Sequence, residues 1–191
     1  MNNVACLKIR MMSEAASGWN FLLQKGFFLQ GKSGMSIRTL LHEVLGYEDD
    51  FIEQTVRTIF QNFRPVDNID SVFIKAGDAI ALGGAMPGIV GIVMGRDNPY
   101  KSFRSDISAH DETVVRDAVP VTVSMKIFST LAVETGVDVL GRGILVEASN
   151  LADFLEKKEK LIIDADGKTG CQFIDELRSM EGKIGIRVTF E

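Results

Sequence analysis

The run of residues 79–95, AIALGGAMPGIVGIVMG, constrains this chain most strongly, because 17 consecutive positions carry no charge. A run of roughly 18 apolar residues has the length of a membrane-spanning helix. Five glycines and Pro87 oppose a continuous helix here, since glycine weakens a helix and proline interrupts it. The sequence therefore predicts a buried strand over 79–82, a glycine-rich turn over 83–88 and a second buried apolar segment over 89–94.

The composition limits the class of protein. With 191 residues, 46% of them hydrophobic and 25% charged, the chain is typical of a soluble globular protein with one domain or two small ones. Its net charge of −5 attracts neither nucleic acid nor an anionic membrane surface. The opening MNNVACLKIRMM carries charges where a signal peptide needs an apolar core, so we expect a cytoplasmic protein without a membrane span.

Cysteine and histidine are too few for most metal chemistry. Cys6 and Cys171 stand far apart, which excludes a disulfide framework and a thiolate zinc cluster, and we expect both to be small buried hydrophobes. His42 falls within a predicted helix, and His110 lies in a polar stretch without a clear ligand set. We therefore expect neither a metal nor a cofactor.

Residues 26–33, GFFLQGKS, match the G-x-x-x-x-G-K-S pattern of a phosphate-binding loop. The four residues between the glycines include two adjacent phenylalanines, which suit an extended strand better than a backbone wrapped around phosphate. We predict strand character in the segment from Trp19 to Gln30, a turn over 31–34, and a helix over 37–45 with Ser36 as its N-cap. A P-loop nucleotide hydrolase is the least favoured functional alternative.

The order of patterns predicts an α+β protein with a mixed sheet. An N-terminal half over 1–95 precedes a polar connection over 96–118 and a C-terminal α/β half over 119–191, with a single shared core as the alternative to two domains. The second half is built on alternating segments, and we expect strands near 121–128, 143–147, 160–164 and 184–190.

The glycine-rich segment is the candidate binding site. Glycines permit close backbone approach, either of another part of the chain or of a ligand. The glycine-rich segment can be interpreted structurally, as a buried crossover between strands. It can also be interpreted functionally, as a docking loop or as an anion-binding nest. The candidate residues are Gly83, Gly84, Met86, Pro87, Gly88 and Gly91, with Arg96, Lys101 and Arg104 as nearby cations.

Two stretches carry a resemblance to a known family. TIFQNFRPVDN followed by IKAGDAIAL resembles the β-grasp, ubiquitin-like sulfur carriers, such as the molybdopterin synthase small subunit and the thiazole-forming carrier. Phe60 with Gln61 or Asn62 corresponds to the strand in that family, and Ala76–Gly77–Asp78 corresponds to its turn. The resemblance implies a β-grasp fold for residues 4–88. Those carriers act through a C-terminal Gly-Gly, whereas Gly83–Gly84 is internal here.

A second resemblance concerns GKSGMSIRTLLHEVLG, TIFQNFRPVDNID and ALGGAMPGIVG, which are similar to a group of bacterial proteins of unknown function. It implies no activity. We favour a non-enzymatic interaction or carrier-like module that docks an unidentified protein partner through residues 83–91, with a homodimer as one form. The alternative is an enzyme that binds a small molecule or anion with the same loop. We expect no nucleic acid partner.

Overall fold

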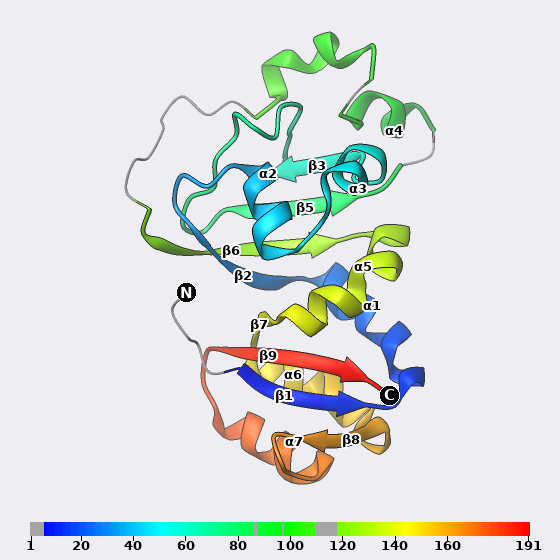
Figure 1. The fold of residues 1–191 in the computed structure, drawn as a ribbon, viewed down its shortest axis with the longest axis vertical. Coiled ribbons are helices and arrows are strands. Elements are labelled where there is room, and N and C mark those ends of the chain that lie inside the picture. Colours follow the sequence, from blue (N-terminus) through cyan, green and yellow to red (C-terminus); the bar gives the residue numbers. More distant parts are fainter. Residues whose placement is uncertain (1–5, 86–87, 97, 110–117) are drawn as a thin grey trace. The chain divides into compact units, whose positions relative to one another are not determined.

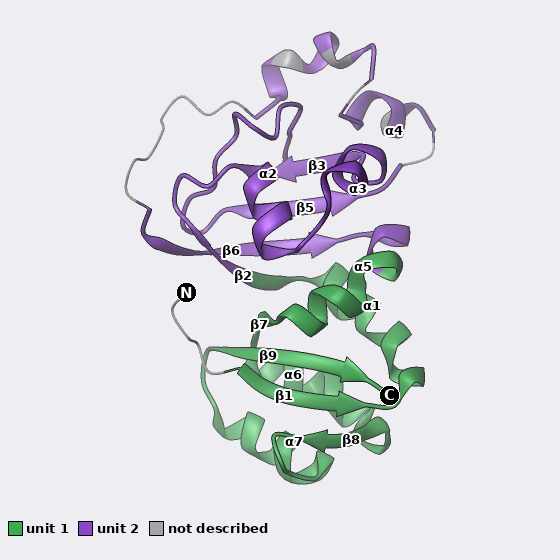
Figure 2. Ribbon diagram, viewed as in Figure 1, with its two compact units in different colours: residues 1–28, 133–191 green, residues 29–132 purple. Residues whose placement is uncertain are grey.

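The computed structural model describes residues 6–85, 88–96, 98–109 and 118–191. Met86 and Pro87, two of the candidate site residues, and His110 lie outside them. Helices and strands alternate with both parallel and antiparallel pairing, so the predicted α+β class with mixed pairing is confirmed. The chain forms two compact units, residues 1–28 with 133–191 and residues 29–132 (Figure 2). These units do not coincide with the ranges expected from the sequence.

The first unit brings the two ends of the described chain together. Its strand order is β7-β9-β1-β8, in which β1 runs parallel to β9 with Ile9 opposite Val188 (Figure 1). β8 and β7 pair antiparallel with β1 and β9, respectively. Its elements are β1 (Cys6–Met11), η1 (Ser13–Ala15), α1 (Ala16–Lys25), the greater part of α5 (Ser129–Arg142), β7 (Ile144–Glu147), α6 (Ala148–Glu156), η4 (Glu159–Leu161), β8 (Ile162–Ala165), α7 (Gly170–Ser179) and β9 (Lys183–Phe190).

The second unit holds the candidate site. Its strands lie in the order β4-β3-β5-β6, with β5 parallel to β6 and the other neighbours antiparallel. The boundary between the units falls within β2 (Phe27–Lys32). The remaining elements are α2 (Ile37–Thr39), the π-helical turn η2 (Leu40–Val44), α3 (Asp49–Gln54), β3 (Thr58–Gln61), β4 (Arg64–Pro65), β5 (Ala79–Gly83), α4 (Gly88–Met94), the 3₁₀ helix η3 (Lys101–Ile107) and β6 (Pro120–Ile127).

Residues 26–33 form a strand where the P-loop pattern requires a loop. β2 continues to Lys32, two residues past the predicted end, and Phe27 and Leu29 are buried. Gly31 lies close to Ile74, because a Cβ there would be 2.6 Å from Cδ1 of Ile74 and that side chain would have to shift. The predicted N-cap is confirmed, since the Ser36 hydroxyl accepts the Thr39 N–H at 3.1 Å.

Three local predictions are wrong. The apolar residues before Gly26 form helix α1 and not a strand, because Trp19, Leu22 and Leu23 recur at helical spacing and are buried together. Residues 89–94 are not a buried segment but part of helix α4, which leaves Ile89 and Ile92 exposed. The two cysteines are exposed. No helix among the described residues is long and apolar enough to cross a membrane.

Candidate functional site

Gly83, the last residue of β5, and Gly84 directly after it lie against the protein's own threonines. Gly83 pairs with Thr58 on the neighbouring β3, and the carbonyl of the buried Gly84 accepts the Thr58 hydroxyl at 3.2 Å. A Cβ on Gly84 would lie 3.3 Å from Oγ1 of Thr130, closer than ordinary contact. Gly84 therefore allows close approach of the protein's own side chains, whereas a Cβ on Gly83 would lie at an ordinary contact distance of 3.9 Å from Cβ of Thr58.

Helix α4 begins at Gly88, whose φ of +79° favours glycine. Gly91 is buried on its inner side, where its carbonyl accepts the Gly95 N–H at 3.0 Å. The outer side of the same helix is apolar: Ile89 is 79% exposed and Ile92 is 53% exposed. The helix thus presents large aliphatic side chains to the solvent.

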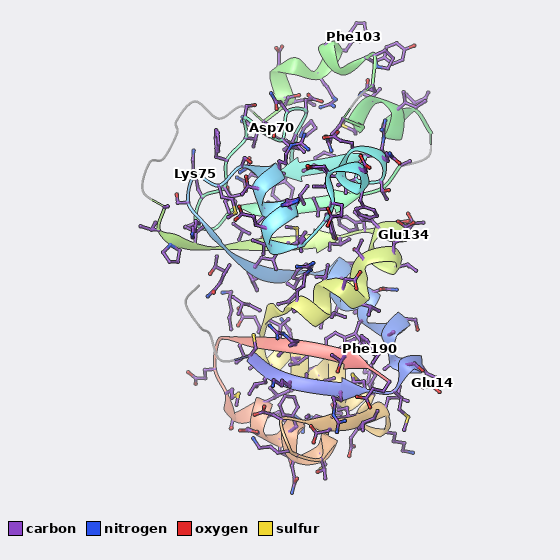
Figure 3. All side chains as sticks on the ribbon, viewed as in Figure 1. Glu14, Asp70, Lys75, Phe103, Glu134 and Phe190 are labelled. Carbon is purple, nitrogen blue, oxygen red and sulfur yellow. The ribbon has the colours of Figure 1, made fainter. Side chains whose placement is uncertain are left out.

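Helix η3 continues this apolar exposure. Phe103 is 85% exposed and projects away from the sheet of its unit (Figure 3), with Tyr100 beside it at a ring-centroid distance of 6.3 Å. Tyr100 and Ile107 are each about half exposed, and α4 and η3 contact each other. We call the five side chains the apolar α4–η3 surface: Ile89, Ile92, Tyr100, Phe103 and Ile107.

The inner side of the same segment is polar, and Arg104 lies at its centre with 3% of its side chain exposed. Its Nη2 and Nη1 donate to the two carboxylate oxygens of Asp67 at 2.6 and 3.2 Å. Its Nε donates to the carbonyl of Val93 at 2.6 Å, and Nη2 also donates to that of Gly95 at 3.0 Å. Nη1 reaches the hydroxyl of Ser108 at 3.2 Å, so all five N–H groups have partners.

Arg96 ties the segment to helix α3 in the same manner. Its Nη1 donates to the carbonyls of Ile52 and Val56 near the C-terminal end of that helix, at 3.2 and 3.1 Å. Its Nη2 donates to Glu53 Oε2 at 2.9 Å. Only its Nε is buried without a partner in the described part of the chain. Both arginines therefore satisfy carbonyls that helix ends leave without intrahelical donors.

Glu53 joins Arg96 to a second arginine. Arg38 donates to Glu53 Oε1 at 2.6 Å and to Asp70 Oδ1 at 2.6 Å. The hydrogen bond from Arg38, reinforced by the charge of Arg96, lowers the pKa of Glu53, although partial burial opposes this shift. The hydrogen bonds to Asp70 and Glu53 raise the pKa of Arg38. The apolar segment is thus linked through charged groups to α2 and α3.

Two of the three cations predicted as an anion nest, Arg96 and Arg104, have internal partners. Arg104 has no free N–H, and the donors of Arg96 point to α3 and Glu53. Lys101 begins η3, and its side chain lies outside the described part. Among the described residues, no three His, Cys, Asp or Glu side chains are placed to hold a metal ion.

Sequence reasoning missed the residues that the structure exposes. Tyr100, Phe103 and Ile107 fall in the stretch interpreted as a polar connection, yet their spacing of three and four residues is helical. That spacing is the signal that identifies them. A further exposed aromatic, Phe63, lies at the β3–β4 turn with φ +67° and is 94% exposed, outside the α4–η3 segment.

The first unit contains an open hollow of about 440 Å³ between α5 and the end of β9. Val137, Val188 and Phe190 give it apolar walls, and Asp138 and Arg142 add one charge of each sign. Its opposite charges and wide opening define no ligand class.

No protein-family model, curated protein or solved structure matches this chain.

We expect Arg104→Met to destabilise the protein by about 1–3 kcal/mol, because it leaves the carbonyls of Val93 and Gly95 and the partly exposed carboxylate of Asp67 without their donor. Urea unfolding followed by circular dichroism measures this loss. Arg64→Met is the matched control, since Arg64 is exposed and makes no ion pair within the described residues, and it should change stability by less than about 0.5 kcal/mol. Equal midpoints for Arg104→Met and wild type would contradict the structural role.

The lowered pKa of Glu53 predicts that the stability of the protein depends on pH. Its pKa in the folded protein lies below the ordinary 4.5, so its contribution is present above about pH 4.5 and disappears as the pH falls through the folded value. Glu53→Gln should be less stable than wild type near neutral pH, with a difference that shrinks in acid. Urea midpoints across this range measure it, with the exposed Glu48→Gln as control. A difference independent of pH would refute the assignment.

Proposed function

We propose that this chain is a non-enzymatic interaction module of the cytoplasm, which binds a protein partner through the apolar α4–η3 surface. The observation that carries the proposal is the reversed polarity of the segment. Its arginines are buried, at 4% and 3% exposure for Arg96 and Arg104, while its isoleucines and aromatic residues face the solvent. Folding alone favours the opposite arrangement.

The size of the surface supports a docking role. If a fully exposed aromatic or isoleucine residue presents about 200 Å², the five exposed fractions amount to roughly 600 Å². Monomeric proteins rarely expose a larger apolar patch than about 300–600 Å², and such patches are often functional. Aromatic residues are also the side chains most enriched at binding hot spots, which makes Phe103 and Tyr100 the expected principal contacts.

We therefore place the proposed binding site on the exposed side chains of α4 and η3, and not on the glycines at the end of β5. Gly84 is buried against Thr58 and Thr130, whereas Ile92 and Phe103 are exposed to a partner. A carrier-like role, which the β-grasp resemblance implies, is proposed here only in the sense of docking. The binding of a small anion has less support, because the guanidinium of Arg104 is fully occupied.

Crosslinking in cell lysate tests the proposal with three variants. Ile92→Asp and Phe103→Asp place a charge within the surface, so we expect both to lose the crosslinked products of the wild type. Phe63→Asp changes an equally exposed phenylalanine elsewhere in the unit and should retain them. Thermal melts verify that all three variants are folded. An unchanged set of products in the two surface variants would reject the proposed docking site.

A further inference from the structure

The charge distribution of the apolar α4–η3 surface restricts what can cover it. Helix α4 contains no ionisable residue, and η3 contains three, of which Arg104 is buried, Asp106 is exposed and the side chain of Lys101 lies outside the described part. In the whole chain, 25% of the residues are charged. The five side chains of the surface carry no charge, so a charged partner group would lose its hydration against them without gaining an ion pair from them.

From this pattern we infer that the α4–η3 surface is a homodimer interface, in which the surface of one copy packs against the same surface of a second. The inference rests on the proposed docking function and names its partner. An apolar patch is complementary to itself, so a two-fold axis through it satisfies both copies with one set of contacts. No opposite charge is needed, which suits a chain that carries a net charge of −5.

The area agrees with a weak dimer. Two copies that each bury roughly 600 Å² would bury about 1,200 Å² together, the lower end of the range for specific interfaces. Interfaces of this size with few polar contacts bind in the micromolar range unless their packing is exceptional. A lipid surface is a poorer occupant, because the net negative charge opposes approach to an anionic membrane.

Dimer formation would also bury the same five side chains, whose exposure to water is the energetically unfavourable feature of the monomer. In the monomer, Phe103 and Ile89 remain more than three-quarters exposed to water. In the dimer they acquire apolar neighbours, while Arg96 and Arg104 keep their partners within each copy. Dimer formation therefore needs no rearrangement of the polar inner side.

Sedimentation velocity on the purified full chain tests the inference across a wide range of concentrations. The wild-type mass should rise with concentration from 21.0 kDa toward twice that value. Ile92→Asp and Phe103→Asp should each weaken association about tenfold or more, because a carboxylate would be buried without a partner. Phe63→Asp, with the same change at an exposed phenylalanine outside the surface, should associate like the wild type.

Mixing two charge variants tests whether the surface meets its own copy. Ile92→Asp and Ile92→Lys should both be monomeric alone, because each buries a charge without a partner, and an equimolar mixture should recover association because the charges on the two copies then have opposite sign. A mixture that associates no better than either variant alone would overturn an interface in which the two copies of Ile92 lie close to each other. Melting curves of each variant exclude unfolding as the cause of a lost dimer.

The remaining outcomes separate this inference from the proposed function. A wild-type chain that stays at 21.0 kDa throughout would overturn the homodimer. If Phe103→Asp still abolished lysate crosslinks in that case, the docking function would stand with a different protein as partner. Wild-type binding to neutral phosphatidylcholine vesicles without self-association would replace the homodimer by a lipid surface. Unchanged dimers in both surface variants would overturn the inference, and the lysate crosslinks of the same variants would then decide the docking function separately.

Discussion

The guanidinium of Arg104 is the interaction on which the candidate site depends. It joins Asp67, which follows β4, to the carbonyls of Val93 and Gly95 at the end of α4 and to Ser108 beyond η3. A helix of seven residues such as α4 is too short to be stable by its own hydrogen bonds. Because the outer side chains of this helix pack against little of the protein, the polar inner contacts must hold it in place.

This arrangement gives the charged residues a structural role and leaves the apolar residues for binding. Arg96 acts at the end of α3 as Arg104 acts at the end of α4, and Glu53 links it to Arg38. The network concentrates buried polar groups in one place, where each removal is costly. Side-chain hydrogen bonds that hold this segment in place reduce the conformational freedom that it would lose on binding, which favours association.

The regular elements with strong local patterns could be predicted from the sequence. The alternation of Val121, Val123, Met125 and Ile127 identifies β6, and the helical spacing of Leu151 and Leu155 identifies α6. The helix α5 could not be recognised in the same way, because its valines, threonines and glycines disfavour helices in isolation. Its buried positions, among them Leu131, Thr135 and Val139, reveal the helical period only once the packing is known.

Only part of the candidate site could be predicted, because its polar contacts join residues that are far apart in the sequence. The uncharged run and the nearby arginines mark the region, but which side of α4 faces water depends on contacts far along the chain. Arg104 pairs with a carboxylate 37 residues away, and Arg96 with a carbonyl 44 residues away. Local periodicity contains no information on such pairs, so it could not distinguish a buried apolar segment from an exposed one.

Hydroxyl-radical footprinting of the dilute protein tests the reversed polarity most directly. The structure contains its own references, since Phe63 is 94% exposed whereas Phe27 and Phe173 are 1% and 0% exposed. The account predicts that Phe103, at 85% exposure, is oxidised nearly as fast as Phe63 and far faster than the two buried phenylalanines. Oxidation of Phe103 as slow as that of Phe27 would mean that the outer side of the segment is covered within the monomer, and would contradict the account.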